Sequence, residues 1–192
     1  MPDIASFLLG SLALLATPGP TNTLLAASGA VLGVRASLRL IPAELAGYLI
    51  AIGLLSLLIV PLMATLPILA PLLKGAAALF LVWSAVSLWR AAGRIANGAP
   101  PPATPRRVFL TTLLNPKAIV FAIVLFPGRD PAWSLPLFSG LVTSVAFGWI
   151  LIGHGLGRIG GPARPTGQVN RLTALILGLF AVLVAGSALS GG

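Results

Sequence analysis

Two short motifs that can do chemistry interrupt stretches of the chain that are otherwise apolar. They are Pro18-Gly19-Pro20-Thr21-Asn22, inside the apolar run 4–31, and Asn115-Pro116-Lys117, inside the run 107–127. Because proline has no backbone N–H, each motif breaks a helical hydrogen-bond ladder and frees carbonyl groups. Unpaired backbone groups are costly in lipid, so such breaks persist where they are buried in protein or line a wet cavity. We therefore expect both motifs to face the protein interior.

The first motif is suited to binding an anion. Pro20 fits the first position of a new half-helix, which would present the N–H groups of Thr21 and Asn22 at the positive end of a helix dipole. A carboxylate binds well at such an end. By the same proline rule, Pro18 and Pro20 are expected to leave the carbonyls of Leu14 and Ala16 without partners.

The second motif adds a full positive charge at depth. Pro116 is expected to free the carbonyl of Thr112, and Asn115 can cap the segment that follows. Lys117 lies too far from the ends of its run to reach the headgroups easily, so it is the strongest single functional candidate. A kink without any binding role is the alternative for one proline alone. Two breaks in matched positions, both with asparagine, favour a binding site.

Few other side chains supply chemistry. The chain has no cysteine, His154 is its only histidine, and its acids are Asp3, Glu44 and Asp130. This composition excludes thiolate and Fe–S chemistry and poorly supports a metal site, so no cofactor is expected. Glu44 either binds a substrate ammonium, carries a proton or pairs with a loop arginine. His154 either relays protons or lies at the membrane interface, and Lys74 is expected to reach the headgroups.

The elements that position these residues are membrane helices. Of the 192 residues, 57% are hydrophobic and 8% are charged, which is typical of a membrane protein. Six apolar runs can each supply the roughly 20 residues that a hydrocarbon core requires. They are residues 4–31, 40–62, 67–90, 107–127, 133–155 and 171–190. We predict an all-α polytopic membrane protein with six transmembrane helices.

A linker rich in Pro, Gly and Ala, residues 91–106, divides the single transporter domain 1–192 into two three-helix halves, 1–90 and 107–192. Three helices in each half make the halves run in opposite directions, so we predict a 3+3 inverted repeat with broken helices 1 and 4. In such repeats, interrupted segments at corresponding positions point to the transport site. Both motifs lie in the first helix of their half.

The net charge of +9 is interpreted as a topology signal. Between the runs, two arginines follow the first, four follow the third and three follow the fifth, against Arg129 alone on the opposite side. The positive-inside rule then makes the basic loops cytoplasmic and both termini extracytoplasmic. The first run lacks a basic n-region, so it is expected to stay in the mature protein rather than to be a signal peptide. The expected partners are a small-molecule substrate and the lipid bilayer, without nucleic acid, and a homodimer is left open.

Several segments together resemble a known family. They are TPGPTNTLL, LGVRASL, LKGAAALFLVWSAVSLWR, LLNPKAIVFAIVLFP and VNRLTALILGLFAVLV. In this order and spacing they are similar to the LysE/RhtB amino-acid exporter family, and the likeness covers most of the chain. It implies a six-helix secondary transporter of the bacterial inner membrane that exports amino acids or related small zwitterions, driven by the proton gradient as an antiporter. The family motifs map onto Pro18, Gly19, Pro20 and Asn22, and onto Asn115, Pro116 and Lys117.

The resulting prediction is alternating access around the two breaks. Lys117 and the N–H groups of Thr21 and Asn22 would hold the substrate carboxylate. Glu44 would receive the ammonium or the coupling proton, with His154 as a second proton-coupling candidate. Two alternatives remain: a non-transporting helical scaffold, and a membrane-embedded enzyme. The enzyme is disfavoured because the sequence lacks paired carboxylates, a nucleophile with its base, or several metal ligands.

Overall fold

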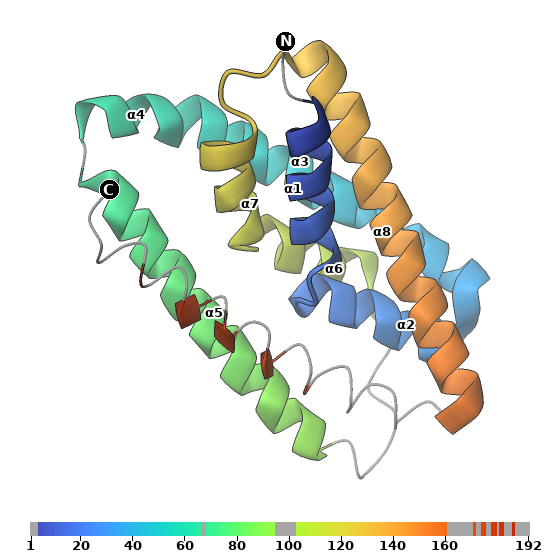
Figure 1. The fold of residues 1–192 in the computed structure, drawn as a ribbon. Coiled ribbons are helices and arrows are strands. Elements are labelled where there is room, and N and C mark those ends of the chain that lie inside the picture. The colour runs from blue at the N-terminus through green and yellow to red at the C-terminus, as the bar shows by residue number, and fades with distance from the viewer. Residues whose placement is uncertain are drawn as a thin grey trace.

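The described part of the chain is helical and contains no strand (Figure 1). The computed structural model describes residues 4–66, 68–94 and 103–160, with a few helical positions between 171 and 186. The helices are α1 (Ile4–Ala16), α2 (Pro20–Ser37), α3 (Ile41–Leu54), α4 (Val60–Thr65), α5 (Leu69–Arg94), α6 (Pro105–Leu113), α7 (Lys117–Val120) and α8 (Pro131–Gly160). A 3₁₀ turn, η1 (Leu38–Leu40), and two π-helical segments, η2 (Leu55–Ile59) and η4 (Phe121–Leu125), connect them. The predicted all-α class is confirmed.

Three helical segments are long and apolar enough to cross a membrane, namely Pro20–Met63, Pro71–Arg90 and Pro131–Ile159. A fourth is added if Pro105–Leu113 and Lys117–Leu125, which meet at an angle of 51°, count as one span. The six-helix inverted repeat stays a prediction, because the described residues supply three or four candidate spans. Most of the last predicted run, 171–190, and much of the linker lie outside the described residues.

The boundary between the first two predicted runs differs from the expectation. After the break at residues 17–19, the chain stays helical from Pro20 to Met63, a stretch of 44 residues, rather than forming a loop near residue 35. Gly33 bends this stretch, because its φ of 78° lies in the left-handed region that glycine tolerates. The Ser37 hydroxyl donates to the Gly33 carbonyl at 2.8 Å and so fixes the bend. The chain therefore turns by a kink and a 3₁₀ turn.

Helices α2 and α8 form the most extensive helix pair, and they lie side by side in Figure 1. Small residues permit this close approach. A Cβ added at Gly29 would collide with the Ile150 carbonyl, and one added at Gly153 would collide with the Ala26 carbonyl. The small residues that the sequence places at four-residue spacing thus serve backbone-to-backbone packing.

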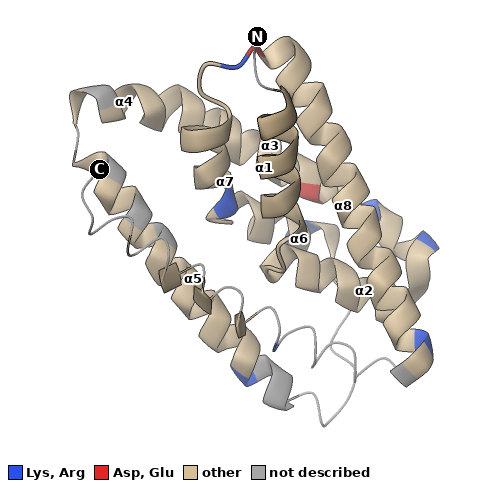
Figure 2. Ribbon diagram, in the orientation of Figure 1, with Lys and Arg blue, Asp and Glu red and all other residues tan. Residues whose placement is uncertain are grey.

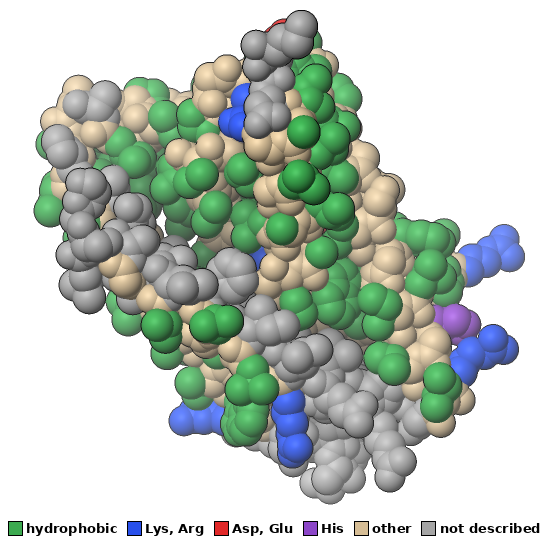
Figure 3. Space-filling view, viewed as in Figure 1, with side chains coloured by type: hydrophobic (Ala, Val, Ile, Leu, Met, Phe, Trp, Pro, Cys, Tyr) green, Lys and Arg blue, Asp and Glu red, His purple; other side chains and the backbone are tan. Residues whose placement is uncertain are grey.

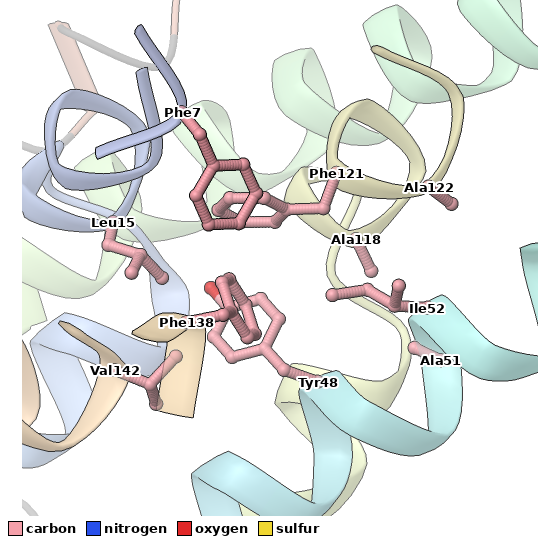
Figure 4. Packing of buried hydrophobic residues seen from close by; sticks show 10 residues of the cluster. All are labelled: Phe7, Leu15, Tyr48, Ala51, Ile52, Ala118, Phe121, Ala122, Phe138 and Val142. Carbon is pink, nitrogen blue, oxygen red and sulfur yellow. The ribbon is translucent and has the colours of Figure 1, made fainter. Parts of the chain in front are cut away.

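The main core lies around the middle of the bundle and is rich in aromatic rings (Figure 4). Phe138 of α8 packs edge-on against Phe121 at 4.8 Å, Phe126 at 5.4 Å and Tyr48 at 5.9 Å between ring centroids. Phe7 of α1 joins this group through Phe126, also edge-on. We call these five rings the aromatic cluster.

Many apolar side chains lie on the face of the bundle that Figure 3 shows, and several basic side chains project from its lower and right-hand edges. In Figure 2 most of the Lys and Arg positions lie away from the start of α1, on the lower and right-hand sides of the bundle. Arg129, between η4 and α8, is close to the start of α1, since its guanidinium carbon lies 5.3 Å from the Phe7 ring centroid. The basic residues are thus segregated along the bundle axis.

Candidate functional site

The first break separates α1 from α2 at Thr17, Pro18 and Gly19. Gly19 is fully extended, with φ −166° and ψ 175°, and Pro20 begins α2. No side chain caps α2, because glycine occupies the cap position. In the part of the chain that the structure describes, the N–H groups of Thr21 and Asn22 have no hydrogen-bond partner. The start of α2 is therefore an uncapped positive helix end, as the sequence predicts.

The second break separates α6 from α7 at residues 114–116. The Asn115 side-chain oxygen accepts from the Lys117 N–H at 3.1 Å, so Asn115 caps the segment that follows. The expectation of a free Thr112 carbonyl is wrong, because this carbonyl accepts from the Asn115 N–H at 3.0 Å. A tighter turn replaces the bond that Pro116 removes.

The two breaks meet through Lys117, whose side chain is 5% exposed. Its ammonium donates to the Thr17 carbonyl at 2.5 Å and to the Leu15 carbonyl at 3.5 Å, both at the end of α1. Gly19 lies beside the lysine, since a Cβ added there would stand 3.4 Å from its Cε and Nζ, in ordinary van der Waals contact. Residues about a hundred positions apart in sequence thus form one junction, which we call the break junction.

Asn22 completes the same end of α1. Its amide nitrogen donates to the Leu15 carbonyl at 2.8 Å and to the Thr17 carbonyl at 3.0 Å. The sequence predicts that the Leu14 and Ala16 carbonyls are the ones set free. The side-chain donors instead bind the Leu15 and Thr17 carbonyls. The chain leaves the helical path at Thr17, so the N–H of Gly19 is not in position to bond the Leu15 carbonyl as it would in a continuous helix.

A set of uncharged polar side chains extends the break junction. The hydroxyls of Thr21 and Thr112 lie 3.2 Å apart. The Asn115 amide nitrogen lies 3.4 Å from the Thr21 hydroxyl and 3.5 Å from the Tyr48 hydroxyl. These long bonds hold Asn115 loosely, since strong N–H···O bonds are near 2.9 Å. This set can exchange its partners for those of a polar solute.

Glu44 adds the only buried carboxylate of the described residues. It lies in the first turn of α3 and is 2% exposed, and its Oε2 has no hydrogen-bond partner in the described structure. Glu44 and Lys117 interact electrostatically without forming a direct ion pair. In Figure 2 the acidic position on α3 lies among the helices, and α3 packs against α8. The site therefore holds one buried acidic side chain and one buried basic side chain.

His154 is not brought into the break junction. It lies on α8 beside Gly33, with its Nδ1 4.0 Å from the place of a Cβ at that glycine. Gly33 follows Pro20 by thirteen residues, which corresponds to roughly 20 Å along a helix. His154 therefore belongs to the basic end of the bundle. The side chain of Lys74 lies outside the described residues.

Sequence reasoning missed two polar side chains of the site, Tyr48 and the Thr112 hydroxyl. Tyr48 is the only tyrosine and follows Glu44 by one helical turn, so it shares a face with that carboxylate. Thr112 precedes Pro116 by one turn. In both cases the spacing from a charged or helix-breaking residue was a usable signal.

The site offers paired recognition of a zwitterion. Uncapped N–H groups and an ammonium suit a carboxylate, and a carboxylate suits an ammonium. No group of three or more His, Cys, Asp or Glu that could hold a metal occurs in the residues that the structure describes. Buried ionisable side chains at helix breaks, within a bundle of membrane-length helices, are typical of transporters with discontinuous helices.

Comparison with known proteins gives the family. The model of the LysE type translocator family matches residues 12–190. The chain belongs to this family, so it is a membrane transporter and not an enzyme. The resemblance read from the motifs is confirmed.

The individual relatives share about a third of their residues or fewer with this chain over the matched regions. The chain is 29% identical to an uncharacterized membrane protein of Vibrio cholerae, over 91% of both chains. It is 33% identical over 92 residues to the homoserine/homoserine lactone efflux proteins of Salmonella typhi and Salmonella typhimurium. That match covers 43% of this chain and 45% of either relative. No solved structure matches the chain.

Proposed function

We propose that this protein exports an amino acid or a related small zwitterion across the bacterial inner membrane, in exchange for protons. The family membership and the efflux activity named for the two Salmonella relatives support export. The segregation of basic residues supports an orientation with the basic end in the cytoplasm and both termini outside.

The observation that carries the proposal is the break junction itself. The substrate carboxylate docks on the N–H groups of Thr21 and Asn22, with the Lys117 ammonium beside it. The substrate ammonium, or the coupling proton, goes to the unpartnered Oε2 of Glu44. Pro18, Gly19, Pro20, Asn115 and Pro116 hold the main chain open around this site.

The energetic cost of the site argues against a scaffold without a solute path. A buried charge without a direct partner costs several kcal/mol, and apolar residues of similar volume pack at least as well. Lys117 bonds the end of α1 and so has a structural use, but a purely structural bundle gains nothing from keeping the unpartnered Oε2 of Glu44 inside. A protein that must bind and release a zwitterion needs an acidic and a basic side chain that are not paired with each other.

His154 is the second proton-coupling candidate, and we assign it a different place in the cycle. It lies at the basic end, so it would exchange protons with the cytoplasm rather than bind the substrate. Glu44 would exchange protons inside the site.

Counterflow in proteoliposomes tests the proposal. Vesicles are loaded with one amino acid, and the uptake of the same labelled amino acid is followed for a panel that includes homoserine. We expect saturable exchange for at least one member, loss of exchange in Glu44→Ala, and retention in Asp130→Asn, which changes an exposed carboxylate. No saturable exchange with any zwitterion would contradict transport of this class and favour the scaffold.

A further inference from the structure

The carbonyl end of α1 is occupied by a cation that the protein itself supplies. A helix C-terminus carries about half a negative charge, and its last carbonyls need donors. Here the Lys117 ammonium reaches the Thr17 and Leu15 carbonyls from another helix and is almost fully buried. The contact joins the two breaks more directly than any other contact of the junction.

Two side chains, Asn22 and Lys117, donate hydrogen bonds to the same two carbonyls at the end of α1. Each carbonyl oxygen accepts two hydrogen bonds. Asn22 donates one to Leu15 and one to Thr17, and Lys117 supplies the second to each. Among the described residues, the hydrogen-bond partners of the ammonium are therefore two main-chain oxygens and no carboxylate, and main-chain oxygens are also ligands of monovalent metal ions at half-helix ends.

Transporters with discontinuous helices use this same position for a coupling ion. Their unwound carbonyls and half-helix C-terminal ends coordinate Na⁺ or protons, while the half-helix N-termini face anionic substrate groups. We infer that the Lys117 ammonium is the resident cation of the carbonyl end of α1 and takes the place of a coupling Na⁺. The protein therefore transports without Na⁺, and the substrate carboxylate has its first partners in the N–H groups of α2.

The packing around Lys117 determines which small molecule could fill the space that is left when the lysine side chain is shortened. A Cβ added at Gly19 would stand 3.4 Å from its Cε and Nζ, and the neighbouring Ala118 is also buried. In Lys117→Ala, the atoms removed are three methylenes and an ammonium, which is the outline of n-propylammonium. The vacated position remains bounded by the Leu15 and Thr17 carbonyls. It is thus a site for a small primary ammonium ion.

Thermal melting of the purified full chain in detergent tests the cation position without using transport. In Lys117→Ala, n-propylammonium at about ten times its Kd should raise the melting temperature by about 3–6 °C. Neutral n-propanol, wild-type protein and the other lysine variant, Lys74→Ala, should show no such rise. A rise with Na⁺ in Lys117→Ala also supports the inference. An equal rise with propanol, or none with propylammonium, would overturn it.

Two further variants test the inference if Lys117→Ala does not fold. Lys117→Arg keeps the charge and the donors, whereas Lys117→Gln keeps donors alone. We expect the arginine variant to melt closer to wild type than the glutamine variant does. A glutamine variant as stable as wild type would show that charge is not needed there.

The transport readout rests on the proposed function and is kept separate. Wild-type counterflow should be unchanged when Na⁺ is replaced by N-methylglucamine, and propylammonium should partly restore counterflow in Lys117→Ala. Wild-type exchange that requires Na⁺ would overturn the inference. Absence of any wild-type exchange would instead overturn the proposed function, and the melting experiment would still decide the cation position.

Discussion

Removing the amide of Asn22 should weaken the break junction by a measurable amount. In Asn22→Leu the branching and the number of side-chain heavy atoms are kept, but the donors to the Leu15 and Thr17 carbonyls are lost. A buried hydrogen bond contributes about 0.5–1.5 kcal/mol, so two should contribute about 1–3 kcal/mol. The cost should not reach that of two orphaned carbonyls, because Lys117 still donates to each of them.

The assay is the free energy of unfolding of the purified protein in mixed micelles, followed by loss of helical signal. Thr143→Val is the matched control. Its hydroxyl also donates to a carbonyl, that of Ser139 at 2.8 Å, but this bond is exposed and lies within one turn of α8. We expect the control to change the free energy by less than about 0.5 kcal/mol. An Asn22→Leu variant as stable as that control would refute the view that Asn22 holds the end of α1.

Three further predictions concern other parts of the bundle. Glu44→Gln should abolish or strongly reduce counterflow. It should leave the melting temperature equal or higher, because it removes a buried carboxylate whose Oε2 has no partner in the described structure. A lower melting temperature together with normal exchange would contradict this prediction. His154→Ala should reduce the initial rate of counterflow less than Glu44→Gln does, since it lies outside the break junction, and parallel rate measurements decide. Gly153→Ala should destabilise the protein by about 1–3 kcal/mol through overpacking against the Ala26 carbonyl. Gly155→Ala, where a Cβ meets open space, should not, and chemical unfolding of the two variants compares them.

The breaks in the helices were predictable because their cause is local. Proline removes a backbone donor wherever it stands, so the positions of both interruptions follow from Pro18, Pro20 and Pro116 alone. The uncapped start of α2 follows for the same reason, since Gly19 has no side chain with which to cap it. These features required no knowledge of the neighbouring helices.

The partners across the junction were not predictable, because they depend on how distant helices pack. The sequence indicates a deep lysine but not that Lys117 binds the carbonyls of Leu15 and Thr17. It indicates a single buried acid, Glu44, but not that the side chains of Tyr48 and Asn115 contact each other in the same site. The long helical stretch through Gly33 was missed because its bend needs one residue with positive φ, where the pattern of arginines had indicated a loop.

The aromatic cluster bears on leakage between transport cycles. It lies between the break junction and the end of the bundle near Arg129, and three of its edge-on pairs share the single ring of Phe138. At about 0.5–1.5 kcal/mol for each pair, separating that ring from its neighbours would cost roughly 1.5–4.5 kcal/mol beyond the loss of packing. Under the proposed function, the Phe138 ring would close this side of the site between transport cycles, and substrate binding would have to supply part of the energy that separates it from its neighbours.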